Sequence, residues 1–170
     1  MNAAPTLDEL LGRCTRSALH LEMRDGYGYS SPGYRAWLEG KPFDRTEFDA
    51  PWVNLIRRTV ERGVGVRRAR IVSEPVSDYV RYEHSATPHA NLAGGELVRW
   101  LPRQRASDLA LPGNDFWLFD EQLVRFGLHS GNGEATGYEL SDDPAVVKLC
   151  ATAFEAVWER GIEHVEYQPS

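Results

Sequence analysis

Arginine is the residue type of this sequence whose spacing best suits binding chemistry. The arginines cluster in two stretches, residues 57–70 and 99–105: Arg57, Arg58, Arg62, Arg67, Arg68, Arg70, Arg99, Arg103 and Arg105. If their guanidinium groups converge, they can hold a phosphate or a carboxylate through paired hydrogen bonds. The alternative is a solvated basic face that pairs with the many acids of the chain.

A second candidate stretch, residues 111–120, joins a turn to a dense aromatic run that ends in an acid. Its letters are LPGNDFWLFD. The aromatic half predicts a core strand, and the apolar residues 123–128, after a short polar turn, predict a second strand paired with it as a hairpin. Asn114, Asp115 and Asp120 would then lie where a packed sheet meets polar side chains.

Known metal and catalytic motifs are missing from the sequence. The histidines are scattered: His20, His84, His89, His129 and His164. None stands in an HExxH, His-x-His or His-Cys spacing, so no metal or other cofactor is expected. No serine stands in a GxSxG elbow, and the glycine-rich run 130–133 lacks the Lys-Ser/Thr pair of a phosphate loop.

Composition narrows the class of protein. A length of 170 residues favours one domain, and 42% hydrophobic against 26% charged residues excludes a disordered chain. Five Trp, seven Tyr and six Phe indicate a sheet with aromatic packing. The net charge of -6 argues against general nucleic-acid affinity, so direct DNA binding is not expected.

Cysteine usage and the N-terminus indicate the compartment. Cys14 and Cys150 stand far apart without a CxxC pattern, which predicts buried thiols in a reducing cytosol. Residues 1–5 show neither a charged nor an apolar leader, and no stretch approaches the roughly 20 apolar residues that span a bilayer. We therefore expect a soluble, cytoplasmic protein with no membrane association.

Periodicity predicts helices in the first half of the chain. Thr6 and Glu9 form a capping-box pattern ahead of an amphipathic helix that ends near Met23. A Gly- and Pro-punctuated loop, residues 24–50, follows with a short helix at 34–39. Its aromatic residues either seal an edge of the core or line a ligand pocket. These residues, 1–50, are expected to form an extension that packs on a core domain.

Residues 51–170 predict that core as an α/β domain. We expect a helix capped by Asp49 that ends at Gly63, a strand at 64–72, a helix opened by residues 73–75, and a strand at 97–101. After the hairpin come a short strand or extended link at 138–140, a helix from Asp143 to Gly161, and a polar, frayed tail.

The order of these elements from residue 64 onward resembles one half of the phospholipase D superfamily. In that family the hairpin strand carries His-x-Lys, with an Asp five residues after the Lys. If Asp120 matches that Asp, the His position falls on Gly113 and the Lys position on Asp115. No His-x-Lys exists anywhere in the chain, because Glu39 and Val146 stand two residues before its only lysines.

The resemblance implies a mixed sheet with helices on both faces and an N-terminal helical extension. Because the imidazole nucleophile and the ammonium group of the family are missing, it also implies a non-enzymatic role. The cleft that faces phosphate in the superfamily would bind a small anion or a partner protein. The ligand-binding candidates are Arg68, Arg70, Glu74, Arg99, Trp100, Asn114, Asp115 and Trp117. Halves of phospholipase D meet across that cleft, which implies a homodimer.

A second resemblance spans nearly the whole chain. Residues 67–75, 98–103, 111–120 and 143–160 resemble a domain-of-unknown-function family of high-GC Gram-positive bacteria, whose genes often lie beside helix-turn-helix regulators. The resemblance implies a regulatory or sensing accessory protein with a helix-turn-helix partner.

Two alternative functions stay open. One is a hydrolase that acts on a phosphodiester or a related ester through Asp115, Asp120, Glu74 or His129. The other is direct DNA binding through the arginines of residues 57–70, which the acidic balance of the chain disfavours.

Overall fold

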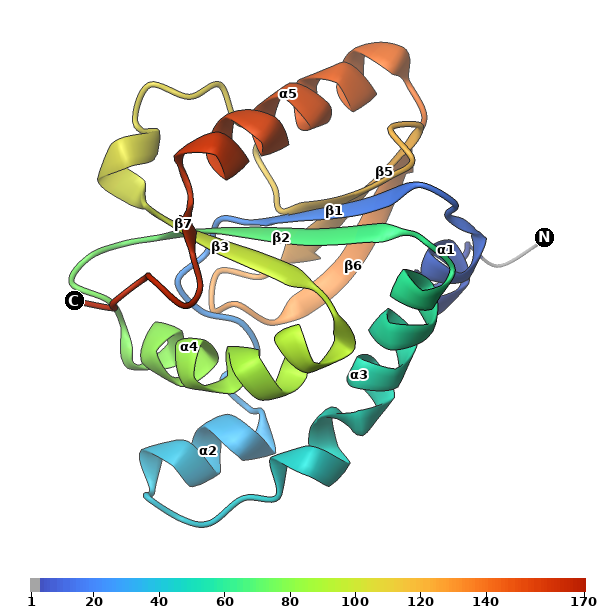
Figure 1. Cartoon of the computed structure of the whole chain (residues 1–170). Coiled ribbons are helices and arrows are strands. Elements are labelled where there is room, and N and C mark those ends of the chain that lie inside the picture. Colours follow the sequence, from blue (N-terminus) through green and yellow to red (C-terminus); the bar gives the residue numbers. More distant parts are fainter. Residues whose placement is uncertain (1–3) are drawn as a thin grey trace.

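Strand β1 (Ser17–Glu22) lies at the centre of a mixed sheet in a computed structural model that describes residues 4–170 (Figure 1). The strand order is β6-β5-β4-β1-β2-β3-β7. The other strands are β2 Gly65–Val72, β3 Leu97–Pro102, β4 Phe116–Phe119, β5 Leu123–His129, β6 Ala135–Ser141 and β7 Ile162–Glu163. Strands β1, β2 and β3 run parallel, and β4 pairs antiparallel with β1.

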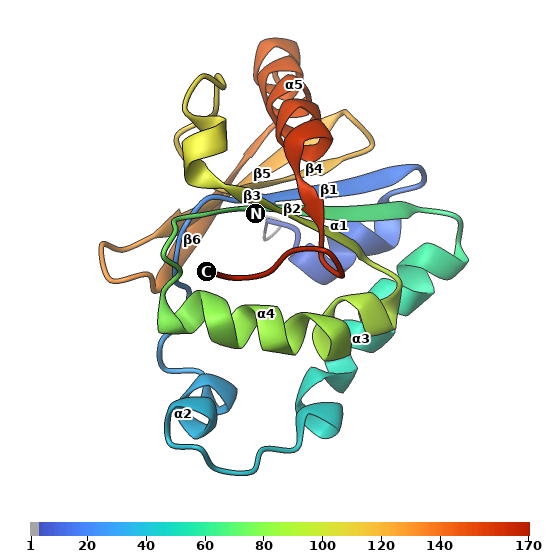
Figure 2. The same ribbon diagram turned by 60° about the vertical axis from the view of Figure 1, so that its left-hand side comes forward.

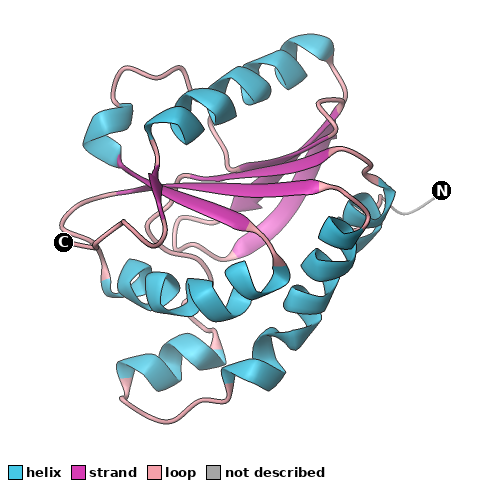
Figure 3. Cartoon of the chain, viewed as in Figure 1, coloured by secondary structure: helices cyan, strands magenta, loops and turns pink. Residues whose placement is uncertain are grey.

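Helices cover both faces of this sheet, as expected. They are α1 Leu7–Arg13, α2 Pro32–Leu38, α3 Arg45–Glu61, α4 Asp78–Ala90 and α5 Pro144–Arg160. Helix α5 lies on one face, while α3 and α4 lie on the other (Figures 2 and 3). Every helix among the described residues is too short or too polar to cross a membrane.

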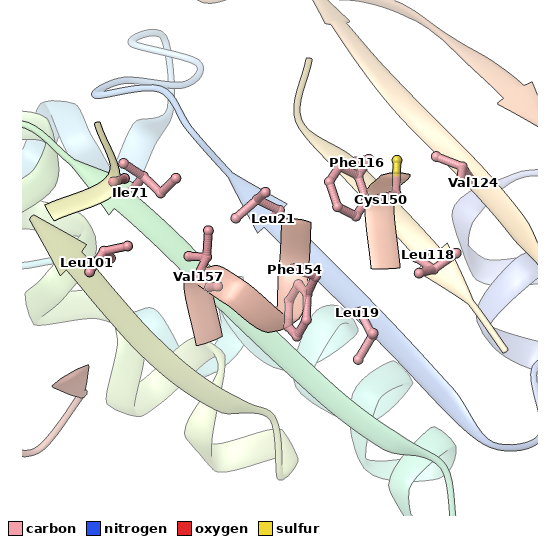
Figure 4. Packing of buried hydrophobic residues seen from close by; sticks show 12 residues of the cluster. Leu19, Leu21, Ile71, Leu101, Phe116, Leu118, Val124, Cys150, Phe154 and Val157 are labelled. Atoms are coloured by element: carbon pink, nitrogen blue, oxygen red, sulfur yellow. The ribbon is translucent and has the colours of Figure 1, made fainter. Parts of the chain in front are cut away.

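The two faces of the sheet differ in chemistry because strand side chains alternate. Leu19 and Leu21 of β1 point to α5 and pack with its Phe154 and Val157 in an apolar core (Figure 4). His20 and Glu22 point to the α3 and α4 side. One face is therefore sealed by hydrophobic burial, and the other carries polar groups at its centre.

The expectation of a long N-terminal helix is wrong. The capping box of Thr6 and Glu9 is present, but the helix ends at Arg13 and the chain then enters β1. Ala18 and Leu21 match the helical period of the preceding turn only because a central strand is buried on both faces. Cys14 is buried as predicted, although it follows the helix instead of lying on its apolar face.

Other expectations are confirmed or need smaller corrections. The strands near residues 64–72 and 97–101, the hairpin of β4 and β5, and helix α5 are confirmed. Helix α3 begins earlier than expected, since Asp44 and not Asp49 caps it and Pro51 lies inside it. The boundary at residue 50 stays a prediction, although β1 lies before it and joins the sheet. Residues 1–3 of the expected extension lie outside the described residues.

The C-terminal residues are packed, so the expectation of a frayed tail is also wrong. Strand β7 pairs with β3, and the chain then crosses to the side of α4 (Figure 1). Tyr167 is 2% exposed and stacks on Trp100 with 5.5 Å between ring centroids. Its hydroxyl donates to Glu74 Oε1 at 2.9 Å. Aromatic burial thus anchors a segment whose polar sequence suggested disorder.

His164 of this tail packs on His84 of α4. The rings of His84 and His164 stack with centroids 4.4 Å apart, and Trp100 Nε1 donates to His164 Nδ1 at 3.1 Å. Burial, together with the neighbouring His84 and Arg70, lowers the pKa of His164 to about 4 from an ordinary 6.5. Burial also lowers the pKa of His84. Both rings are therefore neutral in the folded protein at neutral pH.

This arrangement predicts acid destabilisation of the tail. Between pH 6.5 and about 4, His164 is protonated in the unfolded chain but stays neutral in the folded chain. The free energy of unfolding therefore has its full value above this window and falls as pH drops through it. After allowance for solvent screening, the loss is on the order of 1–2 kcal/mol. Thermal unfolding against pH measures it. His164→Gln should flatten this dependence, whereas exposed His89→Gln should leave it unchanged; equal pH profiles would contradict the assignment.

Candidate functional site

Charged and aromatic side chains surround two cavities on the α3 and α4 side of the sheet. The first cavity, of about 340 Å³, is lined by residues that include Trp52, Arg68, Arg70, Tyr79 and Glu83. The second, of about 290 Å³, is lined by residues that include Asp115, Arg125, Gly127 and His129. His20, Glu22, Tyr27 and Trp117 border both cavities. We call the two cavities together the polar cleft.

Strand register brings the side chains of this cleft side by side. His20 of β1 pairs with Arg68 of β2 on one side and with Trp117 of β4 on the other. Trp117 in turn pairs with Arg125 of β5. Because strand side chains have a period of two, Glu22 lies beside Arg70 on the same face. The cleft is thus a row across four strands and not a loop site.

Glu22 is the centre of an ion-pair network. Its Oε1 accepts a hydrogen bond from Arg68 Nη1, and its Oε2 accepts one from Arg70 Nε at 2.6 Å. Arg68 Nε donates to Glu96 Oε1 at 2.6 Å, and Arg70 Nη2 lies 3.3 Å from Glu83 Oε1. We call these five residues the buried network.

Neutral side chains satisfy the remaining groups of the buried network. Arg70 Nη1 donates to Thr87 Oγ1 at 2.7 Å, and Asn91 Nδ2 donates to Glu96 Oε2 at 2.6 Å. Arg70 is 4% exposed and Glu96 1% exposed. Buried charges are tolerated only when they are paired in this way, so each member of the network depends on the others.

Burial and neighbouring charges set the protonation of the two carboxyls that line the first cavity. Burial raises the pKa of Glu22, but Arg68, Arg70 and His20 outweigh it and hold that pKa well below its usual range. For Glu83, burial raises the pKa to about 7, because Arg70 compensates only in part and Glu22 adds repulsion. Glu22 therefore stays ionised, while Glu83 exchanges its proton near neutral pH.

His20 is fixed by its ring and by both ring nitrogens. It stacks on Trp117 at 4.3 Å between centroids, with the planes 9° apart. Its Nδ1 lies 2.8 Å from the carbonyl oxygen of Phe116, and its Nε2 lies 3.2 Å from Glu22 Oε1. Both neighbours are hydrogen-bond acceptors here, so both contacts are hydrogen bonds only when the imidazole carries two protons.

Asp115 and Tyr27 form a second polar pair in the cleft. Asp115 Oδ1 accepts from the backbone N–H of Met23 at 2.8 Å, and its Oδ2 accepts from the Tyr27 hydroxyl. Burial raises the pKa of both side chains, and Glu22 raises each further. Tyr27 therefore remains protonated and acts as the donor. The hydrogen-bonding capacity of Asp115 is directed at these two partners.

Four of the predicted ligand-binding residues line or border the polar cleft: Arg68, Arg70, Asp115 and Trp117. Trp100 lies beneath them, with its ring 4.8 Å from the Arg70 guanidinium carbon. The other three candidates lie elsewhere. Arg99 faces the α5 side and donates to the carbonyl of Trp158, Glu74 bonds to Tyr167, and Asn114 is exposed in the turn before β4.

The arginines of residues 57–70 do not form one surface. Arg57 and Arg58 are exposed on α3, whereas Arg67 faces α5, where its Nη1 donates to Glu155 Oε2 at 3.2 Å. Strand alternation explains the split, because Arg67 and Arg68 must point to opposite faces. Arg68 then lies in the buried network. This placement gives no support to an extended basic face for DNA.

Several residues of the site were missed from the sequence: His20, Glu22, Glu83, Glu96 and Arg125. Residues 17–22 alternate polar and apolar from His20 onward, and this short signal of a strand was masked by the helical pattern before it. The two alternatives for the aromatic loop, sealing the core edge or lining a pocket, each hold for different residues of it. Tyr27 lines the cleft, and Tyr34 seals the core edge against Tyr79 with ring centroids 5.1 Å apart.

Within residues 4–170, no group of three or more His, Cys, Asp or Glu side chains is arranged to hold a metal ion. The fold is that of a mixed α/β domain, and its strands and helices are arranged like those of a phospholipase D-family protein. NUC from Salmonella typhimurium, a phospholipase D family member, is similar with a TM-score of 0.54 and 10% identity, over 92% of this chain and 86% of that chain. At this identity the likeness concerns the fold alone.

The chain belongs to the family described as domain of unknown function (DUF6879), whose sequence model matches residues 5–169. TrmBL2, described as an archaeal chromatin protein, has a TM-score of 0.47 and 18% identity, over 91% of this chain and 47% of that chain. A comparison with curated proteins found no match.

The buried network predicts a large effect of one isosteric change. Glu22→Gln removes the charge that compensates Arg68 and Arg70, so we expect the free energy of unfolding to fall by about 3–5 kcal/mol. Urea denaturation measures it. Glu159→Gln, at an exposed position of α5, is the matched control and should change stability by less than about 0.5 kcal/mol. A loss at Glu22 no larger than the control would show that the network is not structural.

Proposed function

We propose that the protein is a non-enzymatic regulatory or sensing module that binds a small anion in the polar cleft and partners a helix-turn-helix transcription regulator. The observation that carries this proposal is the buried network. Its charged groups are paired with one another, and Glu22 is held by both Arg68 and Arg70. Such a paired network is pre-formed, which suits recognition of a ligand at the cleft that it borders.

The proposed partner rests on the second sequence resemblance. The genes of that family, from high-GC Gram-positive bacteria, often lie beside helix-turn-helix regulators, and a shared gene neighbourhood fits a shared regulatory task. We also propose a homodimer in the cytoplasm. In this scheme the cleft senses a ligand and the protein changes the activity of its regulator.

A test with purified components follows. We expect the protein to form a complex with the regulator encoded beside its gene, seen as a mass increase in size-exclusion chromatography with light scattering. The same measurement on the protein alone should give about twice 19.2 kDa. Operator binding by the regulator should change about fivefold or more when the protein is added.

An unrelated helix-turn-helix regulator is the control in this experiment and should show neither a complex nor a change in operator binding. Failure of the neighbouring regulator to form a complex at micromolar concentrations would reject the partnership. A single-chain mass for the protein alone would reject the homodimer.

A hydrolase is the second candidate, and one observation favours it. Asp115 and His129, two of the acid and histidine candidates, line the same cavity. The other two lie apart: Asp120 accepts hydrogen bonds from the backbone N–H groups of Thr15 and Arg16, and Glu74 lies beneath the tail. A carboxyl and an imidazole in one cavity are a plausible acid-base pair.

A panel of nitrophenyl phosphodiesters and carboxylic esters distinguishes the two functions. The sensing proposal expects no turnover above buffer. Turnover that Asp115→Asn and His129→Gln each reduce by about a hundredfold, the size of a lost acid-base group, would establish the hydrolase instead. Turnover that both variants leave unchanged would point to a contaminating enzyme.

A further inference from the structure

Arg125 differs from the other arginines of the polar cleft because no carboxylate pairs with it. Among the described residues, its Nε is buried and has no hydrogen-bond partner. The structure shows no ion pair for it within residues 4–170, and its guanidinium carbon lies 4.1 Å from the centroid of the Tyr138 ring. Burial lowers the pKa of Arg125, as expected for a cation without a counter-charge.

Arg68 and Arg70 are not free to bind an anion in this way. Arg68 is paired with Glu22 and Glu96, and Arg70 with Glu22 and Glu83. An incoming anion would have to displace a buried glutamate from one of them. At Arg125 an incoming anion displaces no glutamate. An added negative charge is therefore accommodated beside Arg125 more readily than beside Arg68 or Arg70.

The second cavity has room beside Arg125. Arg125, Gly127 and His129 alternate along β5 and therefore share one face. A Cβ added at Gly127 would lie 3.2 Å from His129 Cε1, so a larger residue there would crowd the histidine. Ala135 and Gly137 of the neighbouring strand β6, which also line this cavity, are small. Both a guanidinium and an imidazole thus border a space that small residues keep open.

The acidic side chains that border the second cavity are not paired with Arg125. Asp115 is directed at the backbone N–H of Met23 and at the Tyr27 hydroxyl. Glu22 is held by Arg68 and Arg70. His20, which also borders the cavity, lies against Glu22 at 3.2 Å. Glu22 and its arginine partners thus lie on the β1 and β2 side of the cleft, whereas Asp115, which lies beside Gly127 of β5, has both carboxyl oxygens engaged.

We propose that Arg125, assisted by His129, binds the oxyanion group of a small ligand in the second cavity, either a phosphate or a carboxylate. This inference rests on the proposed function, because it names the residues and the ligand chemistry of that sensing site. The guanidinium presents a fork of N–H donors that matches two oxygens of either group. The anion would supply the counter-charge that the fold does not, and His129 would add an N–H donor.

Isothermal titration with inorganic phosphate and with acetate, in chloride buffer of constant ionic strength, tests the proposal. We expect at least one of the two anions to bind, and the relative affinities to identify the oxyanion class. Arg125→Gln should weaken that binding at least tenfold, and His129→Gln should weaken it to a smaller extent. Arg58→Gln, which removes an exposed arginine of α3, is the matched control and should bind like the unaltered protein.

Thermal unfolding provides the folding control. Without added anion, Arg125→Gln should unfold at the same temperature as the unaltered protein or higher, since it removes a half-buried cation that has no ion pair within residues 4–170. The bound anion should raise the unfolding temperature of the unaltered protein but not that of Arg125→Gln. If Arg125→Gln does not fold, Arg125→Lys replaces it and should weaken binding at least threefold, because the charge stays while the fork is lost.

Two outcomes overturn the inference. One is that neither anion binds the unaltered protein. The other is that the anion binds Arg125→Gln and Arg125→Lys as tightly as it binds the unaltered protein. Because the regulator complex is measured in chloride alone, failure of anion binding and failure of the regulatory partnership are separate results.

Discussion

The pairing of Glu22 with Arg68 and Arg70 is the interaction on which the rest of the structure depends. It joins the two central parallel strands through their side chains as well as through their backbones. It also reaches α4 through Glu83 and Thr87. A sheet face with this much buried charge can exist only if the charges compensate one another. The neutral partners Thr87 and Asn91 meet the same requirement, because they satisfy groups that the ion pairs leave open.

The same requirement divides the cleft into two chemically different parts. On the β1 and β2 side, ionic groups are committed to each other and hold the architecture. On the β5 side, Arg125 and His129 border a cavity without such commitments. A fold shared with phospholipase D-family proteins therefore does not carry their chemistry automatically, because this chain has no His-x-Lys motif to place in its cleft.

Local patterns in the sequence predicted the later elements well and the first strand badly. The β4–β5 hairpin and helix α5 have strong periods and clear turn or cap residues, so their types were evident. β1 is short and buried on both faces, so its apolar residues fit a helical period equally well, and only its pairing with β2 and β4 resolves the ambiguity. The prediction of the site residues was incomplete for the same reason. Arg68, Arg70 and Trp117 were expected, but Glu22, their partner, was hidden in a supposed helix.

The tail and the cleft meet at Trp100, which lies between Tyr167 on one side and Arg70 on the other. Arg70 also contributes to the lowered pKa of His164. Thermodynamic linkage is reciprocal, so a change in the charge around Arg70 and a change in the protonation of His164 affect one another by the same free energy. The guanidinium that holds Glu22 in the cleft thus also contributes to the acid sensitivity of the C-terminal residues.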